Sequence, residues 1–251
     1  MRESTVIRRI ASVTVVVSMI GVGTACHSGG SGNSSSPAPT TSASANVAPF
    51  SGFIEAVNGA KGPVTYRAEL PQLRDGDAAV RDEFNTGMRA ALDEYLTPPD
   101  DNRPVTVAPG VIDEDNRSEV SHIGFGAVAG VLLLNIFVDH AAHPFNTVST
   151  KVIDVHTAKP ILITDLFTDQ TAGLTALVDG IKAEMADEEK LANQPAPAPV
   201  ADQLGNWVPD DDGLVVYVSV AHVLGDYYPV TVHWDAIAGV LAPGMRDTLT
   251  K

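Results

Sequence analysis

The sequence predicts an α+β domain with a largely antiparallel, mixed sheet and two main helices. Two segments, residues 75–96 and 171–191, have the apolar spacing of amphipathic helices. The segments before, between and after them are short, rich in β-branched residues and separated by Gly, Pro, Asn and Asp, as is typical of strands joined by turns. The order strands, helix, strands, helix, strands therefore favours an α+β architecture in which the helices lie on the sheet.

The N-terminal part of the predicted domain begins with two strands in residues 50–73 around a Gly-rich turn at 58–62. In the helix that follows, one face carries the large apolar residues Val80, Phe84, Met88, Leu92 and Tyr95. Pro98 and Pro99 end this helix, because proline lacks the backbone donor that a helix needs.

The middle of the domain is expected to be extended. Between residues 103 and 140 the chain reads as three strands, and the nearly uninterrupted apolar run 131–138 predicts a central strand covered on both faces. A further strand is expected at 147–155 and a short one within 156–163.

The C-terminal part is expected to begin with a short helical turn capped by Thr164. The buried face of the second long helix is formed by Leu174, Leu177, Val178, Ile181 and Met185. A Pro/Ala-rich surface excursion at 193–203, strands at 212–221 and 227–234, a short helix capped by Asp235 and a charged tail follow.

The first 26 residues have the layout of a secretory signal. Three arginines, at positions 2, 8 and 9, precede an apolar stretch at 10–22 that is shorter than the roughly 20 residues of a membrane span. Cys26, the only cysteine, ends the sequence GTAC, which resembles a bacterial lipobox, although Gly23 stands where Leu, Val or Ile is usual. We expect Cys26 to be the acylated N-terminus and residues 27–49 to be a flexible tether; an ordinary secreted protein is the alternative.

Residues 50–251 are expected to form a single domain with an N-terminal half, 50–140, and a C-terminal half, 141–251. The whole chain has 16 basic and 31 acidic residues, and only three of the former and one of the latter precede residue 50. This strong negative charge, without a patch of Lys and Arg, excludes nucleic-acid binding and docking on anionic lipid. It fits an exported domain whose contact with the membrane is the N-terminal lipid alone, or one with a cationic partner.

Motifs in the second half resemble a known family. In residues 137–167, FVDHAAHPFNTVSTKVIDVHTAKPILITDLF, the pairs His143-Pro144 and Leu166-Phe167 flank Lys159-Pro160-Ile161. From Trp207, DDDGLVVYV leads to VTVHWDAI. The order of these motifs resembles that of the secreted immunogenic MPT-type mycobacterial antigens, which share a domain with the extracellular part of RsiV-type anti-sigma factors.

The resemblance covers roughly residues 50–243 and implies an α+β domain exposed outside the cell. It also implies two possible roles, since the anti-sigma relatives bind lysozyme through this domain and some mycobacterial relatives have been proposed as cell-wall esterases. The chain departs from the family pattern at the loop 222–229, HVLGDYYP, which is bulkier and aromatic.

The H-x-x-H at His140 and His143 is the first candidate site. A zinc site of the H-E-x-x-H type needs a helix and a glutamate, whereas this segment follows an apolar strand and ends at a proline. We therefore interpret it as a turn in which backbone groups satisfy His143, and we expect no metal and no cofactor.

An esterase would need an activated serine, and the G-x-S-x-G pattern is absent. The two serines closest to histidines are Ser121, beside His122, and Ser219, which precedes His222 and Asp226. Ser219 and His222 can point to different faces of a strand, so an ordinary strand serine is the favoured interpretation and no catalytic residue is assigned.

Acidic and aromatic clusters complete the candidates. The acids of DEDN, 113–116, and DDD, 210–212, are interpreted as solvated turns without EF-hand spacing. Trp207, Tyr227, Tyr228 and Trp234 are typical both of binding surfaces and of sheet cores, and core is favoured for Trp234. We expect an exported, lipid-anchored cell-envelope protein whose domain binds a protein such as lysozyme or a cell-wall ligand, with a cell-wall-associated carboxylesterase as the alternative.

Overall fold

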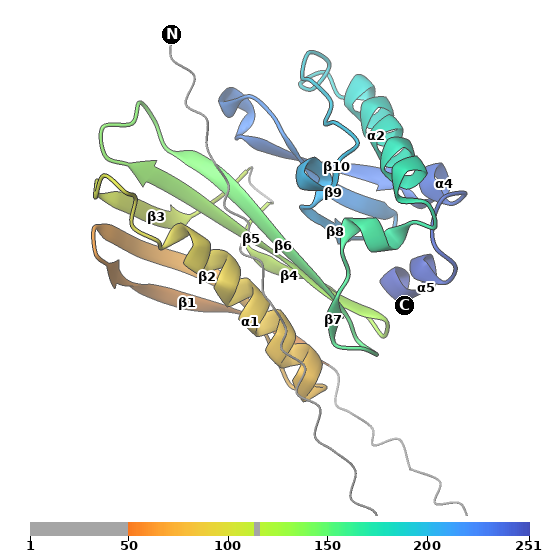
Figure 1. Cartoon of the computed structure of the whole chain (residues 1–251), viewed down its shortest axis with the longest axis horizontal. Coiled ribbons are helices and arrows are strands. Elements are labelled where there is room, and N and C mark those ends of the chain that lie inside the picture. Colours follow the sequence, from red (N-terminus) through yellow and green to blue (C-terminus); the bar gives the residue numbers. More distant parts are fainter. Residues whose placement is uncertain (1–49, 113–115) are drawn as a thin grey trace, which may run out of the picture. The chain divides into compact units, whose positions relative to one another are not determined.

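Two β-sheets, each covered by one long helix, make up the computed structural model, which describes residues 50–112 and 116–251 (Figure 1). The expected signal segment with Cys26, the tether at 27–49 and the acids at 113–115 lie outside the described residues. In the described part of the chain, no helix is both long and apolar enough to span a bilayer.

The first sheet has seven strands in the order β1-β2-β3-β5-β6-β7, with β4 paired to β5. Its strands are β1 (Ser51–Lys61), β2 (Val64–Arg74), β3 (Val105–Pro109), β4 (Glu119–Ile123), β5 (Ala127–Val138), β6 (Phe145–Asp154) and β7 (Lys159–Pro160). All of the pairs are antiparallel except β2 with β3, so the prediction of a largely antiparallel, mixed sheet is confirmed. Strands β6 and β7 follow residue 140, and both halves of the sequence therefore contribute to this sheet.

The helix α1 (Ala78–Tyr95) packs on one face of the first sheet. Its N-cap, Asp77, accepts hydrogen bonds from the backbone N–H groups of Ala79 at 2.9 Å and Val80 at 3.1 Å. The predicted apolar face is buried at Val80, Phe84, Met88 and Leu92, and Tyr95 is half-buried. Its packing partners include alternate residues of β5, namely Val128, Leu132, Leu134 and Ile136.

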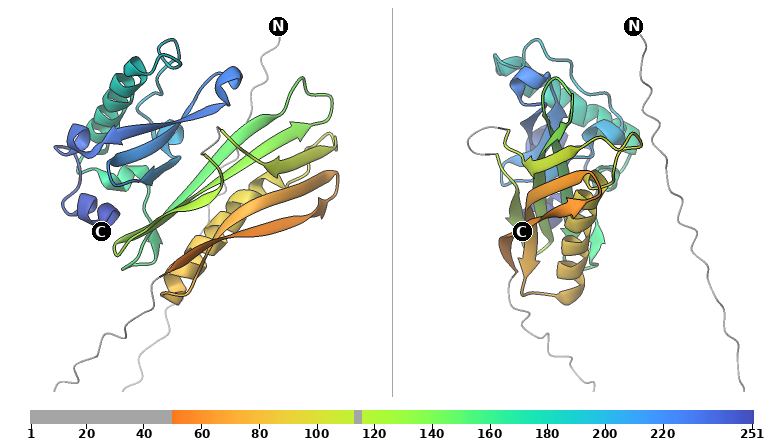
Figure 2. Two further views of the ribbon diagram at one scale, coloured as in Figure 1. Left: turned by 180° about the vertical axis from the view of Figure 1, so that it is seen from behind. Right: turned by 90° about the vertical axis from the view of Figure 1, so that its left-hand side faces the viewer.

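The opposite face of β5 contacts a second sheet, which the sequence did not predict as separate. It has the order β10-β9-β8, with β8 (Trp207–Pro209), β9 (Gly213–Ser219) and β10 (Tyr227–His233). The two-residue strand β7 ends the first sheet at Pro160, and the helix α2 (Gln170–Asp187) follows before the chain becomes extended again. Figure 2, left, shows the resulting layers: α2, second sheet, first sheet, α1.

The helix α2 buries the predicted residues Leu174, Leu177, Val178, Ile181 and Met185 against the second sheet. The close approach is visible at Gly180, where an added Cβ would lie 2.6 Å from a methyl group of Val232. The central strand predicted at residues 131–138 lies within β5; it is buried from Val131 to Leu134 and at Ile136, but Phe137 near its end is exposed.

Three local predictions about the ends of elements were wrong. Thr164 lies inside the 3₁₀ helix η1 (Ile163–Leu166), which starts after Leu162 because the side chain of Asp165 accepts a hydrogen bond from the backbone of Leu162 at 2.9 Å. The second long helix was predicted to run to Leu191, whereas α2 ends at Asp187. Asp235 lies in the first turn of α4 (Trp234–Ile237), whose N-cap is His233 and not Asp235.

Two segments expected to be surface features contain short helices. The Pro/Ala-rich excursion leads into α3 (Ala201–Leu204), and the charged tail forms α5 (Met245–Thr250); Leu204 and Leu249 are fully buried. The tail packs on the turn between β4 and β5, where the backbone N–H of Phe125 donates to the Lys251 carbonyl.

Candidate functional site

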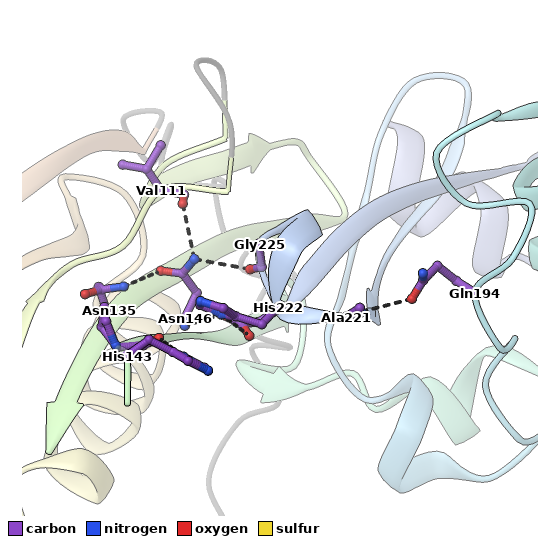
Figure 3. Close-up of polar contacts among 10 residues, drawn as sticks. Val111, Asn135, His143, Asn146, Gln194, Ala221, His222 and Gly225 are labelled. Carbon is purple, nitrogen blue, oxygen red and sulfur yellow. Dashed lines mark hydrogen bonds and ion pairs between the residues drawn. The ribbon is translucent and has the colours of Figure 1, made fainter. Parts of the chain in front are cut away.

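Three loops from the two sheets meet at one rim of the molecule. They are the β5–β6 hairpin loop, residues 139–144, the segment 110–112 after β3, and the 3₁₀ helix η2 (His222–Leu224) between β9 and β10. Figure 3 shows the side chains that join them. We call this the histidine rim, after His143 and His222.

Asn146, at the start of β6, holds the histidine rim together. Its side-chain amide donates to the carbonyl oxygens of Gly225, at 3.2 Å, and Val111, at 3.4 Å. Its Oδ1 accepts from Asn135 Nδ2 at 3.0 Å, and its backbone N–H donates to Asp226 Oδ2 at 2.7 Å. One residue therefore links both long strands of the hairpin to the loop of the second sheet (Figure 3).

The loop of the second sheet has an unusual backbone that favours this arrangement. Gly225 and Asp226 have φ of 97° and 70°, in the left-handed region that Gly adopts freely and Asp more readily than most residues. The turn places the Asp226 carboxylate inward, and its side chain is only 17% exposed.

His222 is oriented by that carboxylate. Its Nδ1 lies 2.9 Å from Asp226 Oδ1, and because a carboxylate only accepts, the hydrogen of this bond is on Nδ1. The neutral ring then presents Nε2 as an acceptor or base, as in the His–Asp half of a catalytic triad.

His143 stacks on His222. The ring centroids are 3.8 Å apart and the planes are inclined by 13°. His143 Nδ1 lies 2.9 Å from the carbonyl oxygen of Pro144, which also only accepts. The interpretation of His143 as a turn residue satisfied by the backbone is confirmed, and the stack on His222 is an addition that the sequence did not reveal.

The two histidines of the H-x-x-H do not act together. His140 has a φ of 64°, its side chain is 83% exposed, and it pairs with Asp139 at 3.1 Å instead of joining His143. Among residues 50–112 and 116–251, no three His, Cys, Asp or Glu side chains gather in a group able to hold a metal ion.

Of the residues considered for an esterase, the structure brings together His222 and Asp226 but not Ser219. Ser219 is the exposed last residue of β9, opposite Tyr227, and it makes no hydrogen bond with His222 in the described structure. Ser121 and His122 lie away from the histidine rim in β4, where Ser121 Oγ and His122 Nε2 are buried and have no hydrogen-bond partner among the residues that the structure describes. Burial lowers the pKa of His122, and the nearby carboxylates of Asp211 and Asp210 oppose this effect.

The tryptophans belong to the core. Trp207 and Trp234 are each 2% exposed, and Trp234 Nε1 donates to the carbonyl oxygens of Asp210 and Asp211 at 3.2 and 3.1 Å. The core interpretation of Trp234 is thereby confirmed, and the acids at 210–212 form the β8–β9 turn, as expected. Tyr227 and Tyr228 are half-buried.

No family model and no curated protein matches the sequence. Two solved structures do resemble the chain. A DUF3298 family protein from Bacteroides fragilis has a TM-score of 0.54 at 13% identity, over 80% of this chain and 97% of that one. One from Pseudomonas aeruginosa has a TM-score of 0.56 at 13% identity, over 78% and 95%.

The fold is that of DUF3298 proteins. Because the function of that domain is unknown and the identity is low, the likeness carries the fold alone. The α+β prediction is confirmed, and a DUF3298-like fold is consistent with the expected RsiV-type domain. The link to the mycobacterial antigens stays a prediction.

Proposed function

We propose that the chain is an exported, lipid-anchored protein of the cell envelope, whose folded domain binds a protein or a cell-wall ligand outside the cytoplasmic membrane. The observation that carries the binding role is the His143–His222 stack, held by the Asp226 carboxylate and the Pro144 carbonyl. Export and anchoring are supported by the sequence of residues 1–49, with Cys26 as the acylated residue.

The histidine rim has the properties of a preorganised binding surface. The hydrogen bonds of Asn146 and Asp226 fix the loops, so little conformational entropy remains to be lost when a partner docks. Apolar side chains stand beside the polar groups: Val223 is 87% exposed and Val111 44%. Exposed apolar groups next to fixed acceptors are typical of interfaces.

A cationic protein such as lysozyme is the partner to test first. The folded part is strongly acidic, and opposite net charges speed up association at low salt. We expect saturable binding of the chain to immobilised lysozyme that weakens as salt is added. His222→Ala should weaken it about tenfold, the effect of losing roughly 1.4 kcal/mol. His140→Ala, which changes an exposed histidine of the β5–β6 loop outside the His143–His222 stack, should bind like wild type.

Absence of saturable binding at low salt would remove lysozyme as the partner. Equal loss with His140→Ala and His222→Ala would show that the His143–His222 stack does not determine binding, since both variants lose one imidazole.

A carboxylesterase is the second candidate function, and the His222–Asp226 pair at 2.9 Å favours it. Ser219 would have to move to reach His222. Turnover of chromogenic esters that is lost in both Ser219→Ala and His222→Ala would support this function. Turnover that is absent, or unchanged in Ser219→Ala, would exclude Ser219 as the nucleophile.

The lipid anchor is tested at Cys26. We expect Cys26→Ala to lose metabolic acyl labelling, to become insensitive to globomycin and to leave the membrane fraction. Processing and membrane retention like those of the wild type would show that the anchoring proposal is wrong.

A further inference from the structure

A groove runs between the C-terminal end of α2 and the open edge of β10. Its volume is about 280 Å³. The lining combines carboxylates of α2, among them Glu184 and Asp187, the apolar side chains of Leu191 and Tyr228, and the backbone of β10 around Thr231. It lies further along β10 than the histidine rim, because η2 precedes that strand.

One wall of the groove is a strand edge that can still form hydrogen bonds. β10 is the terminal strand of the second sheet and, in the described part of the chain, pairs only with β9. At the loop end of this hairpin, the Val220 N–H donates to the Asp226 carbonyl. Along an antiparallel pair of strands, hydrogen-bonded and non-hydrogen-bonded residue pairs alternate. Counted from that bond, Thr231 and its partner Val215 form a non-hydrogen-bonded pair, so the backbone N–H and C=O of Thr231 point away from β9.

Proline at position 229 fits the same alternation. Pro229, opposite Tyr217, is at an equivalent outward position, where its missing N–H breaks no bond to β9. Such a proline also shortens the edge available to another strand. The free edge therefore suits a short extended segment that pairs at Thr231.

The other wall carries unbalanced negative charge. No Lys or Arg lines the groove, and Glu184 and Asp187 form no salt bridge within residues 50–112 and 116–251. The nearest lysine before them, Lys182, is paired with Asp179 at 3.1 Å. The C-terminal end of α2 adds the partial negative charge of the helix dipole at the same place.

The base of the groove is apolar. Leu191 is 2% and Val230 4% exposed, and the half-buried Tyr228 ring stands beside them. Apolar surface next to carboxylates matches the aliphatic stem and charged head of Lys or Arg, which bury the first and keep the second at a polar boundary.

We propose that this groove binds an extended peptide segment of a partner protein that carries Lys or Arg. The segment pairs with the backbone of Thr231, lays a cationic side chain over Leu191 and Tyr228, and places its charged head between Glu184 and Asp187. Strand addition of this kind takes affinity from the backbone and specificity from alternate side chains. The inference rests on the proposed binding function and specifies the chemistry of the partner.

Fluorescence anisotropy with the full-length chain in detergent tests the proposal. The probe is a labelled nonapeptide of alternating valine and lysine, compared with the same peptide carrying glutamate for lysine. We expect binding of the lysine peptide only, with a Kd that rises with salt because the charges are partly exposed. In Glu184→Gln/Asp187→Asn the Kd should rise about tenfold or more.

The matched control is Glu189→Gln/Asp202→Asn, which removes the same charge from residues that neither line the groove nor form a salt bridge in the described part of the chain. It should leave the Kd within about twofold. Equal weakening by both double variants would overturn the groove in favour of net charge alone. Thermal unfolding of each variant confirms that it is folded.

A second peptide tests the strand pairing. N-methylation of alternate residues blocks the backbone donors and should abolish binding at unchanged charge. Binding of this peptide, or of spermidine, as tightly as the parent would overturn strand addition and indicate a site for small amines. A dimer of the chain that excludes the peptide would identify a second copy as the occupant and equally overturn the proposal.

Failure of this inference is distinguishable from failure of the proposed function. If His222→Ala weakens lysozyme binding while the groove variants leave the peptide Kd unchanged, the inference alone is wrong. If the groove variants weaken peptide binding but lysozyme never binds, the groove stands and lysozyme is not the partner.

Discussion

The backbone N–H of Asn146 donates to Asp226 Oδ2 at 2.7 Å and so joins the two sheets at one rim. The other oxygen of the same carboxylate orients His222 at 2.9 Å. A single, largely buried side chain thus couples the packing of the sheets to the position of the ring that His143 stacks on.

Replacement of Asp226 is therefore expected to destabilise the domain. Asp226→Ala leaves the Asn146 N–H without its acceptor, which costs about 1–3 kcal/mol, and it also places alanine at a φ of 70°. Asp226→Asn tolerates that φ and keeps one acceptor oxygen for the Asn146 N–H, so it should destabilise less than alanine, although its NH2 group replaces the acceptor that faces His222 Nδ1. Urea denaturation measures both, with Asp139→Ala, which removes the 3.1 Å contact with the exposed His140, as the control. If Asp226→Ala and Asp139→Ala unfold at the same urea concentration, the coupling does not exist.

Gly126 is required by the docking of the C-terminal helix. A Cβ at this position would overlap the backbone of Thr248 in α5, and overpacking of this kind costs roughly 1–3 kcal/mol. We expect Gly126→Ala to lower the melting temperature and to expose the tail to proteolysis. Gly239→Ala is the control, because nothing lies within 4 Å of the Cβ it would add and its φ is not positive. A melting temperature of Gly126→Ala equal to that of Gly239→Ala would contradict this.

The helices could be predicted from the sequence because their evidence is local. The spacing of Val80, Phe84 and Met88, continued by Leu92, predicts one apolar helix face that packs on a sheet, and all four residues are buried. The end of each helix was less certain because capping depends on tertiary contacts. Trp234, the first residue of α4, is held by hydrogen bonds from its indole and its backbone N–H to the distant β8–β9 turn, and the helix begins there, ahead of the expected Asp235 cap.

Only part of the candidate site could be predicted from the sequence. His222 and Asp226 are close enough along the chain for their pairing to be considered, and they do pair. The stack on His143 depends on the second sheet's packing against the first. The local sequence pattern does not distinguish one ten-stranded sheet from two separate sheets, because side chains alternate between the two faces of a strand in both cases.

Phe84 should contribute much more to stability than its apolar character alone suggests. It is fully buried between α1 and β5, and its ring lies against Gly130. Phe84→Ala is expected to cost about 3–5 kcal/mol, the sum of lost transfer energy and a cavity. Phe125→Ala removes the same ring from a site that is 86% exposed and should change the unfolding free energy by less than about 0.5 kcal/mol. Similar losses in the two variants would show that α1 does not pack on β5 as described.

His122 makes the stability of the fold dependent on pH. Burial lowers its pKa in the folded state below the ordinary value of 6.5, and Asp211 and Asp210 offset part of that effect. As the pH falls below 6.5, the unfolded chain takes up a proton at this histidine before the folded chain does. The stabilisation is therefore complete above pH 6.5 and declines from there down to the lowered pKa, by at most about 1.4 kcal/mol per pH unit.

His122→Gln keeps a polar side chain without a titrating ring, so its unfolding free energy should fall less steeply than that of the wild type between pH 6.5 and 5. Denaturation in urea at several pH values measures the slopes, and His140→Gln, at an exposed position, should keep the wild-type slope. NMR titration of the ring provides an independent check. Asp211→Asn should lower the pKa of His122 further, because it removes a carboxylate that favours the charged ring. A His122 ring that titrates at or above pH 6.5 in the wild type would show that burial does not govern its protonation.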